Sequence, residues 1–147
     1  MSTASLSSAP EALQNGCVCL PQLYENYIQA INQRDWGVFE TMVQPNVSWN
    51  EETYTADEYI SLITRTTIPA PDLQFHIDWL VADEPGQRVA ARLLIRGTPR
   101  EEFLGIPPNG KLKPVEVVEH AFYRFEGGKV AEVQTLIDME GLREQMR

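Results

Sequence analysis

Residues 117–138, VVEHAFYRFEGGKVAEVQTLID, decide the fold because they read as two strands joined by a tight turn. Gly127 and Gly128 separate two apolar runs, and paired glycines accept the positive φ that a two-residue hairpin turn requires. The runs alternate in polarity, as do strands that cover a core with one face. Glu119 and His120 are neighbours in the first strand, so their side chains must point to opposite faces of the sheet.

A second hairpin lies upstream of this one. Residues 73–82 and 88–98 have the residue types and alternation of strands, and the polar segment 83–87 between them contains Pro and Gly, which favour a turn.

Helices are predicted before the strands and after them. Apolar residues recur at helical spacing over residues 20–31, and a shorter helix is expected near residues 36–43. The sequence TADE at 55–58 has the form of a capping box at the start of a third helix. A final short helix is expected over residues 139–145.

This order predicts an α+β domain over residues 20–147, a cone-shaped barrel in which helices pack in a curved antiparallel sheet. Residues 1–19 are predicted to be a flexible tail. The open mouth of such a cone is a natural place for a small apolar ligand.

Composition and charge exclude several classes of function. The chain has 147 residues, which suits one domain, and its formal net charge of −9 disfavours nucleic acid and anionic membranes as partners. Residues 1–19 lack the basic start and apolar stretch of a secretory signal, so a cytoplasmic location is expected. Cys17 and Cys19 form a lone pair without further ligands, and no nucleotide-binding or metalloprotease motif occurs. We therefore expect no metal and no cofactor.

Five segments occur in a characteristic order: Pro71-Asp72, VAARLLIRGT (89–98), GIPPNGK (105–111), YRFEGGKVAEV (123–133) and LIDMEGLREQM (136–146). Together they resemble the SnoaL-like polyketide cyclase family of the nuclear transport factor two-like superfamily. The resemblance covers roughly residues 20–146 and extends to members of fungal biosynthetic clusters. It implies a homodimer formed through the sheet and a cofactor-free enzyme of secondary metabolism that moves protons next to carbonyls.

The resemblance also implies site residues. In family cyclases an acid–base aspartate lies in the last strand and a histidine lies across from it, and these positions are similar to Thr135 and His120 here. Threonine takes up no proton near neutral pH, which puts the family's aldol-type cyclisation in question. A tight turn that pairs Phe125 with Val130 also pairs His120 with Thr135, so His120 is the predicted proton-transfer group.

Two alternatives to this role of His120 stay open. His120 could be a structural residue on the outer face of the sheet. With the opposite alternation, Glu119 would be the buried acid beside Tyr123, and desolvation would raise its pKa until it could act as a base.

The first long hairpin carries a second polar set. Matching Val81 with Val89 places Asp78 opposite Arg92, and His76 shares their face, so the carboxylate could orient the histidine or neutralise the guanidinium. The alternative is a solvated or dimer-facing ion pair, because the opposite face is the more apolar one. That face is expected to carry Phe75, Ile77 and Trp79.

These residues together predict a cofactor-free isomerase or cyclase that acts on a polyketide-derived or meroterpenoid intermediate by general acid/base catalysis. His120 is the expected catalytic group, with His76 and Asp78 assisting it. Two alternatives remain: a dehydratase (a lyase) or hydrolase, if both histidines reach one cavity, or a non-catalytic ligand-binding or dimerisation module. The side chains expected to hold the small-molecule substrate are Tyr24, Tyr27, Trp49, Asn50, Arg92 and Thr135, and Tyr59 has the same ambiguity between core and ligand contact.

Overall fold

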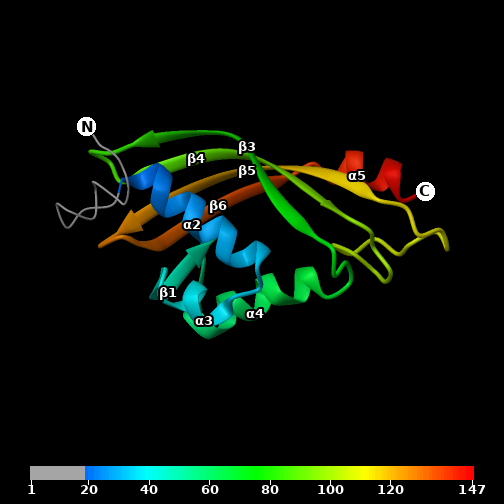
Figure 1. Ribbon diagram of the computed structural model, residues 1–147, viewed down its shortest axis with the longest axis horizontal. Coiled ribbons are helices and arrows are strands. Elements are labelled where there is room, and N and C mark those ends of the chain that lie inside the picture. Colours follow the sequence, from blue (N-terminus) through cyan, green and yellow to red (C-terminus); the bar gives the residue numbers. More distant parts are fainter. Residues whose placement is uncertain (1–18) are drawn as a thin grey trace.

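The computed structural model describes residues 19–147, in which four helices accompany one six-stranded sheet (Figure 1). The predicted tail lies outside the described residues except for Cys19, which is exposed and precedes the first described helix. No helix within residues 19–147 is long and apolar enough to cross a membrane.

Three of the four described helices begin at a residue whose side chain caps them. Helix α2 (Leu20–Asn32) buries one apolar stripe, and α3 (Trp36–Glu40) starts at Asp35, whose carboxylate accepts a hydrogen bond from the Val38 amide. The capping box at α4 (Ala56–Thr67) is present: Thr55 Oγ1 accepts from the Glu58 amide at 3.2 Å, and the Glu58 carboxylate accepts from the Thr55 amide at 2.9 Å. Helix α5 (Met139–Gln145) has the predicted bounds.

The sheet has the strand order β2-β1-β6-β5-β4-β3. Four of its five strand pairs are antiparallel as expected, but β1 runs parallel to β6, so the sheet is mixed. The strand bounds are β1 (Val43–Trp49), β2 (Glu52–Thr55), β3 (Gln74–Asp83), β4 (Arg88–Gly97), β5 (Val115–Glu126) and β6 (Lys129–Ile137).

Helices α2, α3 and α4 cover one face of this sheet, and the core lies between the two layers (Figure 1). Helix α2 contacts β3 and β4, whereas α4 contacts β1 and β2. The largest fully buried side chains are aromatic: Tyr24, Tyr27, Phe39, Tyr59 and Phe103. The α+β prediction is confirmed. Every second residue of a strand points to the face that the helices cover, which is called the inner face below.

Two irregularities change the predicted register. In the last hairpin a shift between Arg124 and Phe125 leaves Phe125 opposite Val130 as expected, but it places Ala121 opposite Thr135. The predicted pairing of His120 with Thr135 is therefore wrong, because one extra residue moves every later pair by one position. This bulge turns Thr135 to the inner face of the sheet, together with the odd-numbered residues of β5.

A similar shift occurs in β3 at Asp78. Before it, His76 lies opposite Leu94 as predicted, but after it Val81 lies opposite Ala90 instead of Val89. The bulge also turns Trp79 to the outer face, where its side chain is 58% exposed. The prediction that Trp79 joins the apolar inner face is therefore wrong.

Candidate active site

A cavity of about 100 Å³ lies between the inner face of the sheet and helices α2 and α4. Branched apolar side chains make half of its wall, and the loop after β4 contributes Phe103 and Leu104. These two residues begin a tight turn in which the amides and carbonyls of Phe103 and Ile106 are mutually hydrogen-bonded at 2.9 Å. The polar side chains at the wall are Tyr27, Trp49, Tyr59, Thr66, Glu119, Tyr123 and Thr135.

Glu119 is the acid of this cavity. The side chain comes from the middle of β5, between Val117 and Ala121 on the inner face, and only 8% of the residue is exposed. No arginine, lysine or histidine lies among the described residues of the cavity wall. Burial raises the pKa of Glu119 from 4.5 to about 7, because removing a carboxylate from water disfavours its charged form. The carboxyl can therefore both accept and donate a proton near neutral pH.

Tyrosines surround this acid. Burial raises the pKa of Tyr24, Tyr59 and Tyr123, and the nearby charge of Glu119 contributes to each rise. These phenols therefore stay protonated and can donate hydrogen bonds. The hydroxyls of Tyr27 and Tyr59 lie 2.5 Å apart, so one donates to the other. The hydroxyl of Tyr24 is buried and has no hydrogen-bond partner among residues 19–147.

Thr135 faces the same cavity from β6. Its hydroxyl oxygen accepts a hydrogen bond from Trp49 Nε1 at 3.1 Å and from Asn50 Nδ2 at 3.4 Å. The backbone N–H of Thr135 donates to Asn50 Oδ1 at 2.8 Å, and the backbone N–H of Asn50 donates to the Val133 carbonyl at 2.9 Å. Asn50 has a φ of 48°, a left-handed conformation that asparagine tolerates well and that leads the chain from β1 into β2. These hydrogen bonds of Asn50 connect the end of β1 to β6 beside the cavity.

His120 lies on the opposite face of the sheet from this cavity. Its neighbours across β4 and β6 are Arg92 and Leu136, and its side chain is exposed. The prediction that His120 projects into the cavity is wrong, because strand alternation puts Glu119 inside and His120 outside. The alternative with a buried Glu119 is the one that the structure supports.

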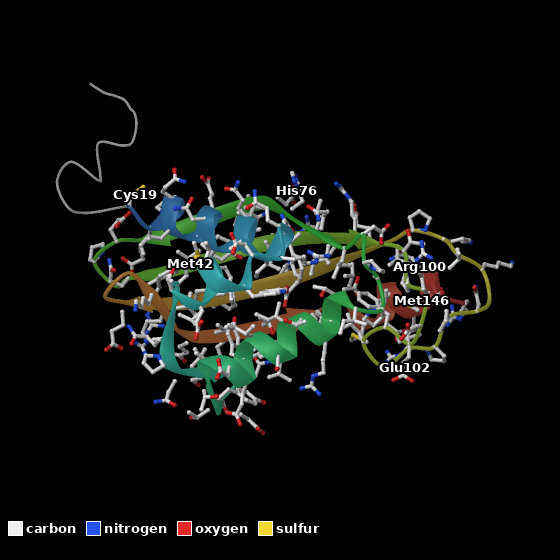
Figure 2. All side chains as sticks on the ribbon, turned by 60° about the horizontal axis from the view of Figure 1, so that its bottom comes forward. Cys19, Met42, His76, Arg100, Glu102 and Met146 are labelled. Carbon is white, nitrogen blue, oxygen red and sulfur yellow. The ribbon has the colours of Figure 1, made fainter. Side chains whose placement is uncertain are left out.

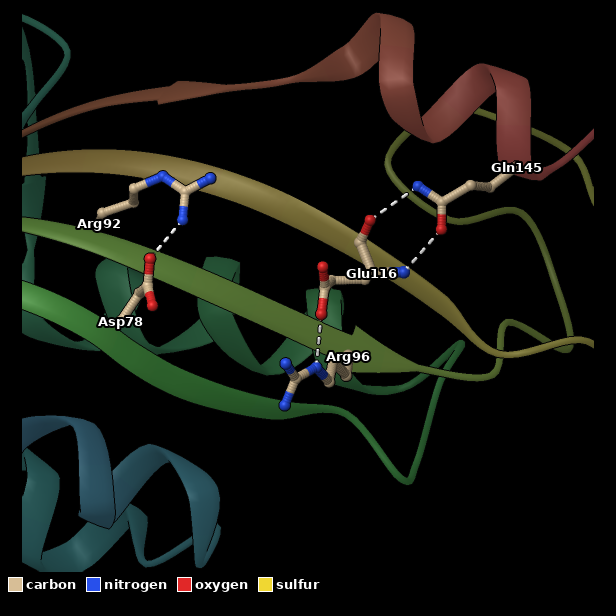
Figure 3. Close-up of polar contacts among 5 residues, drawn as sticks. All are labelled: Asp78, Arg92, Arg96, Glu116 and Gln145. Atoms are coloured by element: carbon tan, nitrogen blue, oxygen red, sulfur yellow. Dashed lines mark hydrogen bonds and ion pairs between the residues drawn. The ribbon is translucent and has the colours of Figure 1, made fainter.

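The second polar set also lies on the outer face. His76 is exposed and points away from the helices (Figure 2). Asp78 and Arg92 form an ion pair there, with side chains 36% and 33% exposed, next to the Arg96–Glu116 pair at 2.6 Å (Figure 3). His76, Asp78 and Arg92 therefore do not line the cavity. The solvated ion pair, which was the alternative, is what the structure shows.

The other residues that were expected to hold the substrate divide between core and cavity. Tyr27 and Trp49 line the cavity, and Asn50 contacts it through Thr135. Tyr24 belongs to the packed core beside Tyr123, and their ring centroids are 4.8 Å apart.

Both histidines of the chain lie outside the cavity. The dehydratase or hydrolase alternative required both histidines to reach one cavity, and this condition is not met. No group of His, Cys, Asp or Glu within residues 19–147 is arranged to hold a metal ion.

Phe103 and Leu104 are wall residues that the sequence did not reveal. They lie in a loop with no periodic pattern, and the available signal was the pair of apolar residues before Gly105 in a polar segment.

Comparisons with known proteins agree with this architecture. The family model for SnoaL-like polyketide cyclases matches residues 21–146. A solved SnoaL-like polyketide cyclase from Agrobacterium tumefaciens is 30% identical, with a TM-score of 0.80 over 88% of this chain and 99% of the other.

Two structures from Streptomyces share the fold at lower identity. IdmH from Streptomyces antibioticus is 20% identical, with a TM-score of 0.75 over 87% of this chain and 98% of its own. TsrD from Streptomyces laurentii is 24% identical, with a TM-score of 0.75 over 86% and 93%. A search of curated protein sequences finds no match.

Proposed function

The chain belongs to the SnoaL-like polyketide cyclase family, and from this premise we propose that it isomerises or cyclises a polyketide-derived or meroterpenoid intermediate without a cofactor, with Glu119 moving the proton. The observation that carries the proposal is a carboxyl group that faces an apolar cavity with no cation among the described wall residues. A buried carboxylate without a cation costs stability, so its presence in this wall favours a chemical role.

The proposed step is proton transfer at the carbon next to a carbonyl. The Glu119 carboxylate removes a proton from that carbon, the electron pair of the C–H bond forms a C=C bond, and the carbonyl oxygen takes up the negative charge. The protonated Glu119 then returns the proton to a carbon of the resulting enolate. Return to a different carbon isomerises the substrate. In the alternative outcome the enolate carbon attacks a second carbonyl and closes a ring, the π bond of that carbonyl breaks, and the resulting alkoxide takes the proton from Glu119.

A minimal ketone tests this step without knowledge of the natural substrate. Cyclohex-3-en-1-one is a single ring that suits a small cavity, and moving one proton converts it into the conjugated cyclohex-2-en-1-one, which absorbs in the ultraviolet. We expect the wild-type protein to accelerate this conversion and Glu119→Gln to abolish the acceleration. Glu116→Gln is the matched control, because Glu116 lies on the same strand with its side chain on the outer face, 46% exposed.

The pH dependence of this conversion adds a second criterion. The rate should rise with pH with a midpoint near 7, because the base is active when Glu119 is deprotonated. His120→Ala should keep full activity. Equal rates in wild type and Glu119→Gln would reject proton transfer by Glu119 and would favour a ligand-binding module.

We further propose that the protein is a homodimer formed through the outer face of the sheet. Trp79 and Leu136 lie in one cross-strand row and Val81 and Phe122 lie in the next, and their side chains are 56% to 76% exposed. Such a group of exposed large apolar side chains is typical of a contact surface. Leu136→Lys should convert a dimer into a monomer in light scattering, whereas the change Leu112→Lys, at an exposed leucine in the loop after β4, should not.

A further inference from the structure

The hydroxyl of Thr135 has its acceptor capacity filled by two N–H groups. A hydroxyl oxygen has two lone pairs, and here Trp49 Nε1 and Asn50 Nδ2 donate to them. The remaining hydrogen-bonding capacity is the O–H proton, which has no acceptor among residues 19–147. Because Thr135 lines the cavity, that proton is available to a ligand, and donation by Trp49 and Asn50 strengthens it as a donor.

Thr66 provides a contrast within the same cavity. It lines the wall from helix α4, but its hydroxyl donates to the Leu62 carbonyl one turn earlier at 3.2 Å. Its proton is therefore already used, and the two threonines differ in what they offer to a ligand.

Thr135 and Glu119 face the cavity from neighbouring strands. Thr135 lies opposite Ala121, and Ile137 lies opposite Glu119, so Thr135 and Glu119 are diagonal neighbours on one face. Such neighbours are about 7–8 Å apart, with their Cβ atoms somewhat closer, and we infer that a ketone can contact the hydroxyl and the carboxyl together.

We propose that the Thr135 hydroxyl, oriented by Trp49 and Asn50, binds the carbonyl oxygen of a neutral, enolisable ketone or ester whose adjacent carbon faces Glu119. This inference deepens the proposed function and rests on it for the identity of the proton-transfer group. Thr135 donates to the oxygen that becomes negative when the proton leaves the carbon, and Trp49 and Asn50 are positioning residues. The substrate is neutral because the described wall residues include no cation to balance a carboxylate or a phosphate.

Phenol and toluene are suitable probes because they have nearly the same shape and differ by the oxygen. Phenol also resembles an enol, the species that Thr135 is proposed to stabilise. Binding of each is measured by NMR titration of the wild-type protein and of Thr135→Val, which keeps the shape of the side chain and loses the hydroxyl. Thr66→Val is the matched control.

We expect Thr135→Val to weaken phenol binding roughly tenfold, the effect of one lost hydrogen bond from a polarised donor, and to leave toluene binding unchanged. Thr135→Ser should restore most of the phenol affinity, and Thr66→Val should affect neither probe. Unchanged toluene binding shows at the same time that the variant cavity is intact.

Three results would overturn the assignment: equal weakening of both probes by Thr135→Val, no weakening of either, or no binding of phenol in the wild-type cavity. The outcome is separable from that of the proposed function, because it is a binding measurement. If phenol binding depends on Thr135 while Glu119→Gln leaves isomerisation unchanged, the donor stands and the proton-transfer role falls. The converse result removes Thr135 and leaves Glu119 as the base.

Discussion

Replacing Glu119 with glutamine should make the protein more stable at alkaline pH and change its stability little at acidic pH. The folded protein raises the pKa of Glu119 from 4.5 to about 7 by burial. The unfolded chain therefore loses this proton at lower pH than the folded protein does. The stability that the neutral carboxyl allows is fully present below pH 4.5 and is lost as the pH rises through 7.

The magnitude follows from the two pKa values. At 1.36 kcal/mol per pKa unit, the charged carboxylate costs the folded state about 3 kcal/mol above pH 7. Between pH 5.5 and pH 8.5 the cost grows by about 2 kcal/mol, since part of it is already present at pH 5.5. Glutamine has a similar shape and no titration, so the variant lacks this loss.

Urea denaturation followed by circular dichroism measures this difference at constant ionic strength. The free energy of unfolding of Glu119→Gln relative to wild type should increase by about 2 kcal/mol from pH 5.5 to pH 8.5. Glu116→Gln is the control, because this carboxylate lies at the surface in an ion pair with Arg96. Parallel pH profiles of wild type and Glu119→Gln would show that Glu119 is solvated, and the premise of the proposed chemistry would be lost.

Three further substitutions test the packing and the site. Gly97→Ala places a methyl group 2.7 Å from Leu73 Cδ1 and 3.1 Å from Leu73 Cα, so unfolding should become easier by about 1–3 kcal/mol; an unchanged urea midpoint would contradict this close approach. Thr55→Ala removes the cap of α4 and should cost about 1 kcal/mol in the same measurement, unless the helix start is held by packing alone. Trp49→Phe keeps an aromatic ring and removes the donor to Thr135; phenol binding should weaken severalfold with toluene binding preserved, and equal losses would assign Trp49 to shape alone.

The element order was predictable from the sequence because it depends on local signals. Capping residues, turn glycines and apolar periodicity lie within a few residues of the element that they define, so the capping box at Thr55 and the helix over residues 139–145 were found from the sequence. The side chains of the cavity were harder to assign, because a face depends on the register of strands that are far apart in sequence.

Two bulges account for most of the errors. The position of a bulge cannot be predicted from the alternation of polar and apolar residues when both neighbouring positions tolerate either kind of side chain. At Asp78 it moved Trp79 from the predicted inner face to the outer one, and at Arg124 it moved Thr135 from opposite His120 to opposite Ala121. The resemblance to family cyclases placed a histidine opposite the position of Thr135. A register without the bulge also places His120 opposite Thr135, so the two arguments agreed by coincidence.

The hydroxyl at Thr135 and the acid at Glu119 have a common geometric basis. The two positions are diagonal neighbours on one face of a single hairpin, so a carboxyl at either one reaches the same cavity. A carboxyl on β5 leaves the β6 position free to provide a hydroxyl, and the site then holds a proton acceptor and an oxygen donor on adjacent strands. This arrangement links stability and activity through one ionisation. Below pH 4.5 the carboxyl is neutral in the folded and the unfolded protein and the base is blocked; between pH 4.5 and 7 the fold loses stability, and above pH 7 the base is charged and the loss is complete. The stability loss should therefore level off near the pH at which the isomerisation rate is half-maximal. A stability loss that levels off at a clearly different pH would show that the group controlling the rate is not the buried carboxyl of β5.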